Sequence, residues 1–140
     1  MKFEAIQPGL SGEVSLVVAG EHTARHLGSG VIGVLATPQM VLLMERAGLA
    51  AVEHLLPEGY HTVGAHLDIR HLAPTPIGFE VRARAELVEV EGRRLAFRVE
   101  VREVDEGPGE LVGEGTHQRY IVSAERFGAR VDQKVRSLSR

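Results

Sequence analysis

The sequence predicts an α+β domain in which a curled antiparallel sheet of about five strands wraps around one long buried helix. Two observations predict this arrangement. First, the stretch from Leu35 to Leu56 is apolar on most sides of a helix, which is typical of a buried helix. Second, apolar and polar residues alternate with period two through most of residues 61–122, as expected for strands joined by short turns. One strand, one helix and then four strands describe a sheet packed on a helix.

The chain before the helix contains one predicted strand. Residues 13–19 place Val14, Leu16 and Val18 on one face, and Gly20 follows at the end of the strand. Residues 22–27 are expected to form a loop or a short helical turn. Gly28-Ser29-Gly30 then gives a flexible entry to the helix.

The central helix has recognisable start and stop signals. Thr37 is suited to cap its N-terminus, and Pro38 is suited to its first turn, where a missing N–H has no cost. Pro57 and Gly59 predict that the helix stops near Leu56.

One polar residue of this helix is out of place. Gln39, Arg46 and Glu53 recur every seven residues and predict a narrow solvated stripe. Glu45 lies about 100° from that stripe, among apolar neighbours, and is therefore expected to face the core. A buried carboxylate needs a hydrogen-bonding partner or a raised pKa.

After the helix, residues 61–73 predict a strand that Pro74-Thr75-Pro76 interrupts. One face of this strand is apolar except for His71: Val63, Ala65, Leu67, Ile69, His71 and Ala73. Further strands are predicted over residues 79–88, 94–102 and 111–122, with a bulge or strand end at residues 87–88 and a hairpin turn at Glu91-Gly92. The tail from Ala124 is expected to be a short helix or to fray. An open sheet edge predicts pairing with a second copy.

Length and composition limit the possible functions. A chain of 140 residues that is 44% apolar fits a single domain over residues 1–140. A net charge of −3 without a basic run argues against a nucleic-acid partner. The absence of cysteine excludes disulfides and thiolate chemistry. No signal peptide or membrane span is evident, so a cytoplasmic protein without a membrane partner is expected.

Three polar residues suggest chemistry. Glu45 and His71 interrupt faces that meet if the sheet wraps the helix, and together they would form a general-base pair. Thr37 adds a hydroxyl beside helix N-terminal N–H groups, which are able to stabilise an oxyanion. The structural alternatives are a plain N-cap for Thr37, a satisfied core histidine, and a glutamate that bonds loop amides.

A metal site is not expected. His61, His66 and His71 are five residues apart, so successive side chains point to opposite faces of the strand. His22 and His26 supply two ligands without a third. Gly28-Ser29-Gly30 lacks the GK[ST] of a phosphate loop, and there is no G-x-S-x-G elbow of a serine hydrolase.

An ordered set of motifs resembles the fluoroacetyl-CoA thioesterase-like branch of the hotdog-fold thioesterases. The set comprises His22-Thr23-Ala24-Arg25-His26-Leu27, Thr37-Pro38, Met44-Glu45, Gly64, and His71 with Ala73-Pro74-Thr75-Pro76-Ile77-Gly78. It continues with Glu91-Gly92-Arg93-Arg94-Leu95, Gly115-Thr116-His117-Gln118-Arg119, and Phe127, Ala129, Val131, Gln133 and Lys134. The resemblance thus covers most of the chain.

The resemblance implies a hotdog fold, a homodimer or possible tetramer with active sites at the dimer interface, and hydrolysis of acyl-CoA thioesters without a metal or other cofactor. It implies that Thr37, Glu45 and His71 are catalytic, that Gly64 lines the acyl site, and that Arg119 is the basic residue near the coenzyme A end. The family's fluoroacetyl-CoA-hydrolysing member has a longer lid that contains phenylalanine. Here residues 28–36 separate Leu27 from Thr37 and include no aromatic residue.

The sequence therefore predicts an acyl-CoA thioesterase that acts on a short or small acyl group. A non-catalytic acyl-CoA or small-ligand binding module with the same fold is the main alternative, and a dehydratase is a further one. The acyl chain and the choice between covalent and direct hydrolysis are left open by the residues alone.

Overall fold

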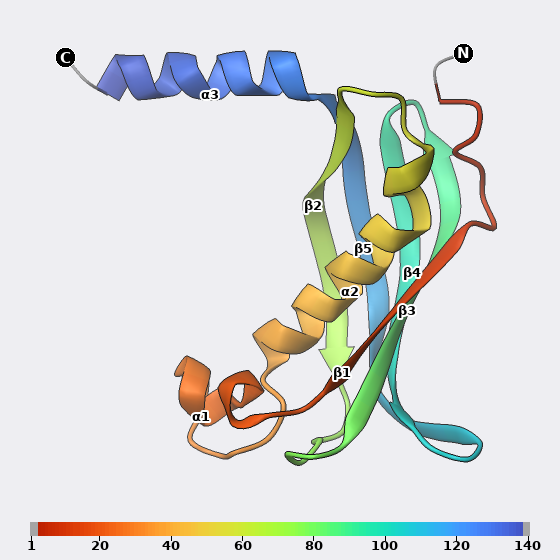
Figure 1. The fold of residues 1–140 in the computed structure, drawn as a ribbon, viewed down its shortest axis with the longest axis vertical. Coiled ribbons are helices and arrows are strands. Elements are labelled where there is room, and N and C mark those ends of the chain that lie inside the picture. The colour runs from red at the N-terminus through yellow and green to blue at the C-terminus, as the bar shows by residue number, and fades with distance from the viewer. Residues whose placement is uncertain (1–2, 139–140) are drawn as a thin grey trace.

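Five antiparallel strands form one curled sheet with the order β1-β3-β4-β5-β2 (Figure 1). The computed structural model describes residues 3–138. The strands are β1 (Ser11–Val17), β2 (Tyr60–His71), β3 (Glu80–Glu91), β4 (Arg94–Val104) and β5 (Pro108–Ser123). The helices are η1 (Gly20–His22), α1 (Ala24–Leu27), α2 (Thr37–Val52), η2 (Glu53–Leu55) and α3 (Ala124–Leu138). The predicted hotdog architecture of a sheet wrapped on a central helix is confirmed.

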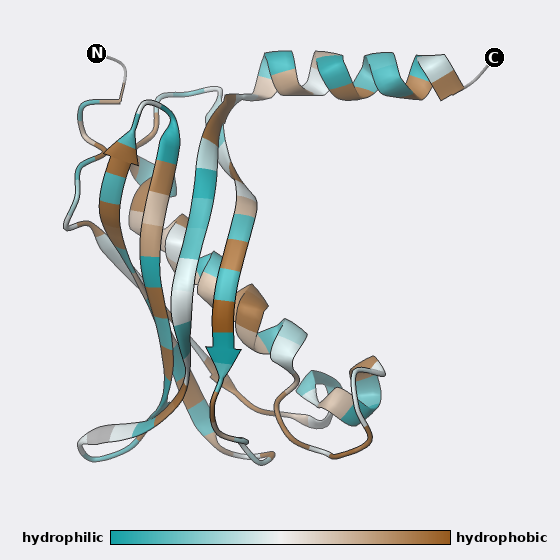
Figure 2. Cartoon of the chain, turned by 180° about the vertical axis from the view of Figure 1, so that it is seen from behind, coloured by the Kyte–Doolittle hydropathy of each residue, from teal (hydrophilic) through white to brown (hydrophobic). Residues whose placement is uncertain are grey.

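The core lies between α2 and the concave face of the sheet. Side chains from one face of α2 are buried: Met40, Leu43, Met44, Ala47, Ala51 and Val52. They pack against alternate residues of β3 and β4, and the alternation of hydrophobic and hydrophilic residues gives these strands the banded colouring of Figure 2. At Gly12 of β1 a Cβ atom would lie 2.5 Å from the carbonyl oxygen of Ala47, so only glycine lets this strand approach the helix so closely.

The central helix differs from its prediction in two ways. It ends at Val52, and the predicted last turn is the 3₁₀ helix η2. It is also not buried on all sides, because Leu42 and Ala50 are exposed and the side chain of Glu45 is 33% exposed. Glu45 therefore lies at the margin of the core rather than inside it.

The predicted single apolar face of β2 is wrong, because a bulge at Ala65 reverses the alternation. Gly64 pairs with Arg119 and His66 pairs with Gln118, so Ala65 is left without a partner position. Before the bulge, Thr62 and Gly64 face α2; after it, Ile69 and His71 do so. An odd spacing of seven residues would otherwise put Gly64 and His71 on opposite faces.

Other elements follow the predictions with shifted ends. Residues 24–27 form a short helix, and the bulge expected at residues 87–88 is present between Leu87 and Glu89. The tail is a 15-residue helix that projects from the body of the molecule, rather than a short or frayed segment (Figure 1).

Candidate functional site

Thr37 and His71 meet where the start of α2 reaches the end of β2. The hydroxyl Oγ1 of Thr37 lies 2.8 Å from Nδ1 of His71, within hydrogen-bond distance. The prediction that Thr37 caps the helix is wrong: Ala36 occupies the N-cap position and Thr37 is the first helical residue. The threonine hydroxyl is therefore directed at the imidazole and not at the helix amides.

His71 has the environment of a neutral imidazole. Burial lowers its pKa below the ordinary value of 6.5, an effect that outweighs the opposite contribution of the backbone of Ala73. Its Nε2 atom is buried and has no hydrogen-bond partner among the described residues. A neutral ring bonded to a hydroxyl is the arrangement that a general base requires.

A cavity of about 350 Å³ opens beside this pair. Ser29 and Leu35 line it on one side, and Leu72 and Pro74 line it on the other. The first turn of α2 carries no side-chain cap at this point. Helix N-terminal N–H groups favour negative charge, so an anionic oxygen near Thr37 would be stabilised.

Glu45 belongs to a second cluster, about 12 Å further along α2 by the rise of 1.5 Å per residue over eight residues. Its Oε2 atom lies 3.7 Å from Nη1 of Arg119, whose side chain is only 6% exposed. The predicted partnership of Glu45 with His71 is not observed: within the described part of one chain they share no hydrogen bond. Glu45 and Arg119 form an ion pair instead.

Arg119 is held in place from three sides. Its Nε donates to Oγ1 of Thr62 at 2.8 Å, and its Nη2 donates to the carbonyl oxygen of Thr62 at 3.1 Å. Its Nη1 donates to Nε2 of His117 at 3.2 Å. Since Nδ1 of His117 must donate to the carbonyl oxygen of His66, at 2.8 Å, His117 is a neutral ring whose Nε2 accepts.

Burial disfavours the charged forms of both basic side chains in this cluster. The pKa of His117 is lowered by burial, and the pKa of Arg119 is also lowered by burial, against which the negative charge of Glu45 acts to raise it. Arg119 remains charged because its ordinary pKa is far above neutrality. The cluster therefore places a buried positive charge beside the Glu45 carboxylate at the margin of the core.

Gly64 allows this carboxylate to approach the strand. A Cβ atom at Gly64 would lie 2.6 Å from Oε2 of Glu45 and 3.4 Å from Nη1 of Arg119. The predicted set thus separates into two groups in one chain: Thr37 with His71, and Glu45 with Gly64 and Arg119. The predicted role of Arg119 at the coenzyme A end stays a prediction.

His117 and Thr62 were not predicted as site residues, although the sequence contains a signal for one of them. The inward positions of β5 are Gly113, Gly115, His117, Arg119 and Ile121, so two polar residues follow two glycines on a face that should be apolar. Thr62 could not be predicted as a site residue from the sequence, because the bulge at Ala65 determines whether Thr62 faces the helix or the solvent.

The Gly64→Ala variant is expected to fold. Its kcat for the hydrolysis of an acyl-CoA ester, the reaction that the resemblance implies, is expected to fall about 10- to 100-fold, because the new methyl group displaces the Glu45 carboxylate. Steady-state kinetics and the melting temperature should be measured together. Gly20→Ala is the matched control, because a Cβ atom there has no neighbour within 4 Å and φ is not positive. Equal kcat values for the two variants would contradict the prediction.

No group of three or more His, Cys, Asp or Glu side chains placed to hold a metal ion occurs within residues 3–138. In the same range, no helix has the length and apolar character needed to cross a membrane.

Comparisons with known proteins point to one family. The model of the fluoroacetyl-CoA-specific thioesterase family matches residues 18–125. The fluoroacetyl-CoA thioesterase of Streptantibioticus cattleyicolor is 43% identical over 102 residues, which cover 72% of this chain and 70% of that protein.

Solved structures of thioesterases have the same fold as this chain. A crystal structure of a fluoroacetyl-CoA thioesterase superposes with a TM-score of 0.83 at 36% identity and covers 92% of this chain and 97% of its own. A thioesterase superfamily member from Thermus thermophilus gives a TM-score of 0.86 at 31% identity and covers 96% of this chain and 98% of its own.

Proposed function

The chain belongs to the fluoroacetyl-CoA-specific thioesterase family, and from this premise we propose that it hydrolyses a short acyl-CoA thioester through Thr37, His71 and Glu45. Thioester hydrolysis itself follows from the family. The residue roles are supported chiefly by the 2.8 Å contact between the Thr37 hydroxyl and the His71 imidazole at the mouth of a cavity.

In the proposed reaction, Nδ1 of His71 takes the proton of the Thr37 hydroxyl while Oγ1 bonds to the thioester carbonyl carbon. The N-terminal turn of α2 stabilises the resulting oxyanion. The C–S bond then breaks, and His71 returns the proton to the leaving thiolate of coenzyme A. The proposed steps use side chains and backbone N–H groups of the protein together with water.

In this proposal Glu45 acts as the general base in the second half of the reaction, the hydrolysis of the acyl-threonine. As a carboxylate paired with Arg119, it removes a proton from the water that attacks the acyl-threonine carbonyl. The bond between the acyl carbon and Oγ1 of Thr37 then breaks, and the proton passes from Glu45 to Oγ1, so that the free acid and the Thr37 hydroxyl are released. Since Glu45 forms an ion pair with Arg119 at 3.7 Å and no contact with His71 in the same chain, activation of water suits it better than orientation of the imidazole.

The two clusters come closer if two copies pair through β2. This strand is an open edge of twelve residues, and its middle residues 65–68 are exposed. A two-fold antiparallel pairing along its whole length puts Tyr60 of one copy opposite His71 of the other. Gly64 of the second copy is then four residues from His71 along the strand, instead of seven, which supports a homodimer with shared sites.

A panel of acyl-CoA esters with a free-thiol reagent tests this function. The panel should include acetyl-CoA, fluoroacetyl-CoA and longer chains, since residues 28–36 contain no aromatic residue to select for fluorine. Rapid release of thiol from a short ester is expected, with an acyl adduct on Thr37 trapped after quenching. Tight binding without thiol release would instead identify a binding module, and reversible hydration of an enoyl thioester would identify a dehydratase.

The pH dependence is a further prediction. His71 acts as a base only when neutral, and its lowered pKa keeps it neutral to more acidic pH than a free histidine. The acidic limb of kcat/KM is therefore expected to have its midpoint below pH 6.5. Initial rates between about pH 5 and 8 locate this midpoint, and a midpoint above 6.5 would exclude the assigned environment of His71.

A further inference from the structure

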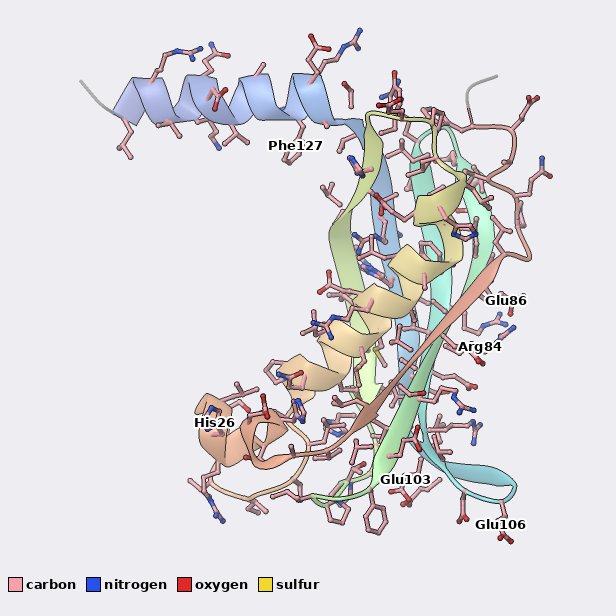
Figure 3. All side chains as sticks on the ribbon, viewed as in Figure 1. His26, Arg84, Glu86, Glu103, Glu106 and Phe127 are labelled. Atoms are coloured by element: carbon pink, nitrogen blue, oxygen red, sulfur yellow. The ribbon has the colours of Figure 1, made fainter. Side chains whose placement is uncertain are left out.

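Helix α3 presents an apolar stripe to solvent. Phe127, Val131 and Leu138 recur at helical spacing and are 45%, 46% and 86% exposed, and Val135 lies in the same stripe. In Figure 3 the side chain of Phe127 extends from the side of α3 that faces along the strands. The remaining positions of the helix are largely charged.

Such a helix needs a surface to pack on. An isolated helix of 15 residues is marginally stable in water, and most helical stability in proteins comes from packing of an apolar face. None of the described residues of α3 is buried. Within the described residues, Phe127 borders a pocket beside β5, but the stripe marked by Phe127, Val131 and Leu138 stays exposed and is available to a surface from a second molecule.

The direction of α3 indicates where this surface lies. Figures 1 and 2 both show the helix running across the end of β2 and beyond it, away from the rest of the sheet. β2 is the edge strand, so the space under α3 is the space that a strand paired with β2 would occupy. A helix of about 22 Å spans the width of about four strands.

A complementary surface lies at the opposite end of the same strand. Leu72 lines the Thr37–His71 cavity and is 50% exposed. The segment that contributes Ser29 and Val34 to the same lining also carries exposed apolar side chains, and together with Leu72 we call them the apolar rim: Leu27, Val31 and Ile32 are 43%, 82% and 64% exposed. In a two-fold pairing along β2, Tyr60 lies opposite His71 of the second copy. This places the origin of α3, which follows Ser123 next to Tyr60, beside the rim of that copy.

We propose that α3 of one copy docks on the apolar rim of a second copy and closes its Thr37–His71 cavity in trans. Two-fold symmetry supports a second copy as the docking partner. Each chain carries α3 near the Tyr60 end of β2 and the apolar rim near the His71 end, and a two-fold axis brings α3 of each copy to the rim of the other. The docked helix excludes water from the acyl site. The catalytic consequence rests on the proposed thioesterase function; the docking itself does not.

Crosslinking tests the docking without reference to activity. The chain has no cysteine, so Ile32→Cys/Val131→Cys introduces the only two thiols. A short bismaleimide is expected to give a product of twice the chain mass. A crosslinked product of single-chain mass would show that α3 folds onto its own rim, and would overturn the proposal. Ile32→Cys/Gln133→Cys, with the second thiol on the opposite face of α3, should crosslink much less.

Activity then tests the closure. Val131→Glu is expected to lower kcat/KM by about tenfold or more, whereas Gln133→Glu, the same change of charge on the opposite face, should leave it near the wild-type value. A heterodimer of Val131→Glu with His71→Ala has one intact site, covered by the unmodified α3 of the other chain. Wild-type activity per intact His71 is expected; activity as low as that of the Val131→Glu homodimer would overturn the trans arrangement.

The outcomes separate the two proposals. If no acyl-CoA ester is hydrolysed but the double-mass crosslink forms, the proposed function fails and the docking stands. If esters are hydrolysed by a monomer, or if Val131→Glu only weakens binding to anionic lipid vesicles, α3 serves another partner and the docking proposal is wrong.

Discussion

Replacement of His71 by alanine is expected to lower kcat for a short acyl-CoA ester by about 10²- to 10⁴-fold, the range that a positioned acid or base contributes. The variant loses the acceptor of the Thr37 proton, 2.8 Å away in the wild type, and also the group that protonates the leaving thiolate. KM should change little, because the imidazole is a small part of the surface that a coenzyme A ester contacts. Steady-state kinetics with the free-thiol reagent measure both constants.

His54→Ala is the control for this variant, because His54 is exposed and lies in η2, outside both clusters. It should retain wild-type kcat and KM. A His71→Ala enzyme that remains as active as His54→Ala would remove His71 from the mechanism.

The Thr37–His71 pair should act as a unit. Thr37→Val keeps the shape of the side chain and removes the hydroxyl, and the double variant with His71→Ala should be little worse than the more damaging single variant. Multiplication of the two losses would show that the residues act independently and that Thr37 is not the nucleophile that His71 activates.

The sequence was sufficient to predict the central helix and that His71 faces it, but it paired His71 with Glu45, whereas the observed partner is Thr37. Apolar residues on most sides of residues 35–56 left no other place for that segment than the inside of the sheet. His71, as the polar exception on an apolar face, then had to meet the helix. Which part of the helix it meets depends on how α2 lies across the sheet: His71, at the end of β2, contacts Thr37 at the start of α2, and Glu45 is about 12 Å further along the helix.

The partner of Glu45 was beyond prediction from the sequence. It depends on the bulge at Ala65. With this bulge, Gly64 faces the helix and pairs with Arg119 of β5, so the Arg119 side chain points toward Glu45. The adjacent apolar residues Leu87 and Val88 break the alternation and so indicated the bulge in β3, but the alternation continues unbroken through residues 63–67 and gave no sign of the bulge at Ala65. The position of α3 was likewise unpredictable, because none of its described residues is buried.

Glu45→Gln is expected to lower kcat by about 10²- to 10⁴-fold while the protein stays folded, because the amide keeps the shape of the side chain but cannot accept a proton from water. The contacts of Arg119 with Thr62 and His117 remain, so the guanidinium keeps its place. In the proposed two-step reaction the acyl-threonine should accumulate, since only its hydrolysis needs Glu45. Rapid quenching and mass analysis would detect this adduct.

The pH profile of the same variant distinguishes the two possible roles of the carboxylate. If Glu45 oriented the imidazole, its loss would change the pKa of His71 and move the acidic limb of kcat/KM. Since the ion pair with Arg119 occupies Glu45 instead, the limb is expected at its wild-type position with only the plateau lowered. Glu58→Gln is the matched control: it removes an exposed carboxylate in the turn between η2 and β2, outside both clusters, and should leave both limb and plateau nearly unchanged. A shifted limb in Glu45→Gln alone would return Glu45 to the role of orienting His71.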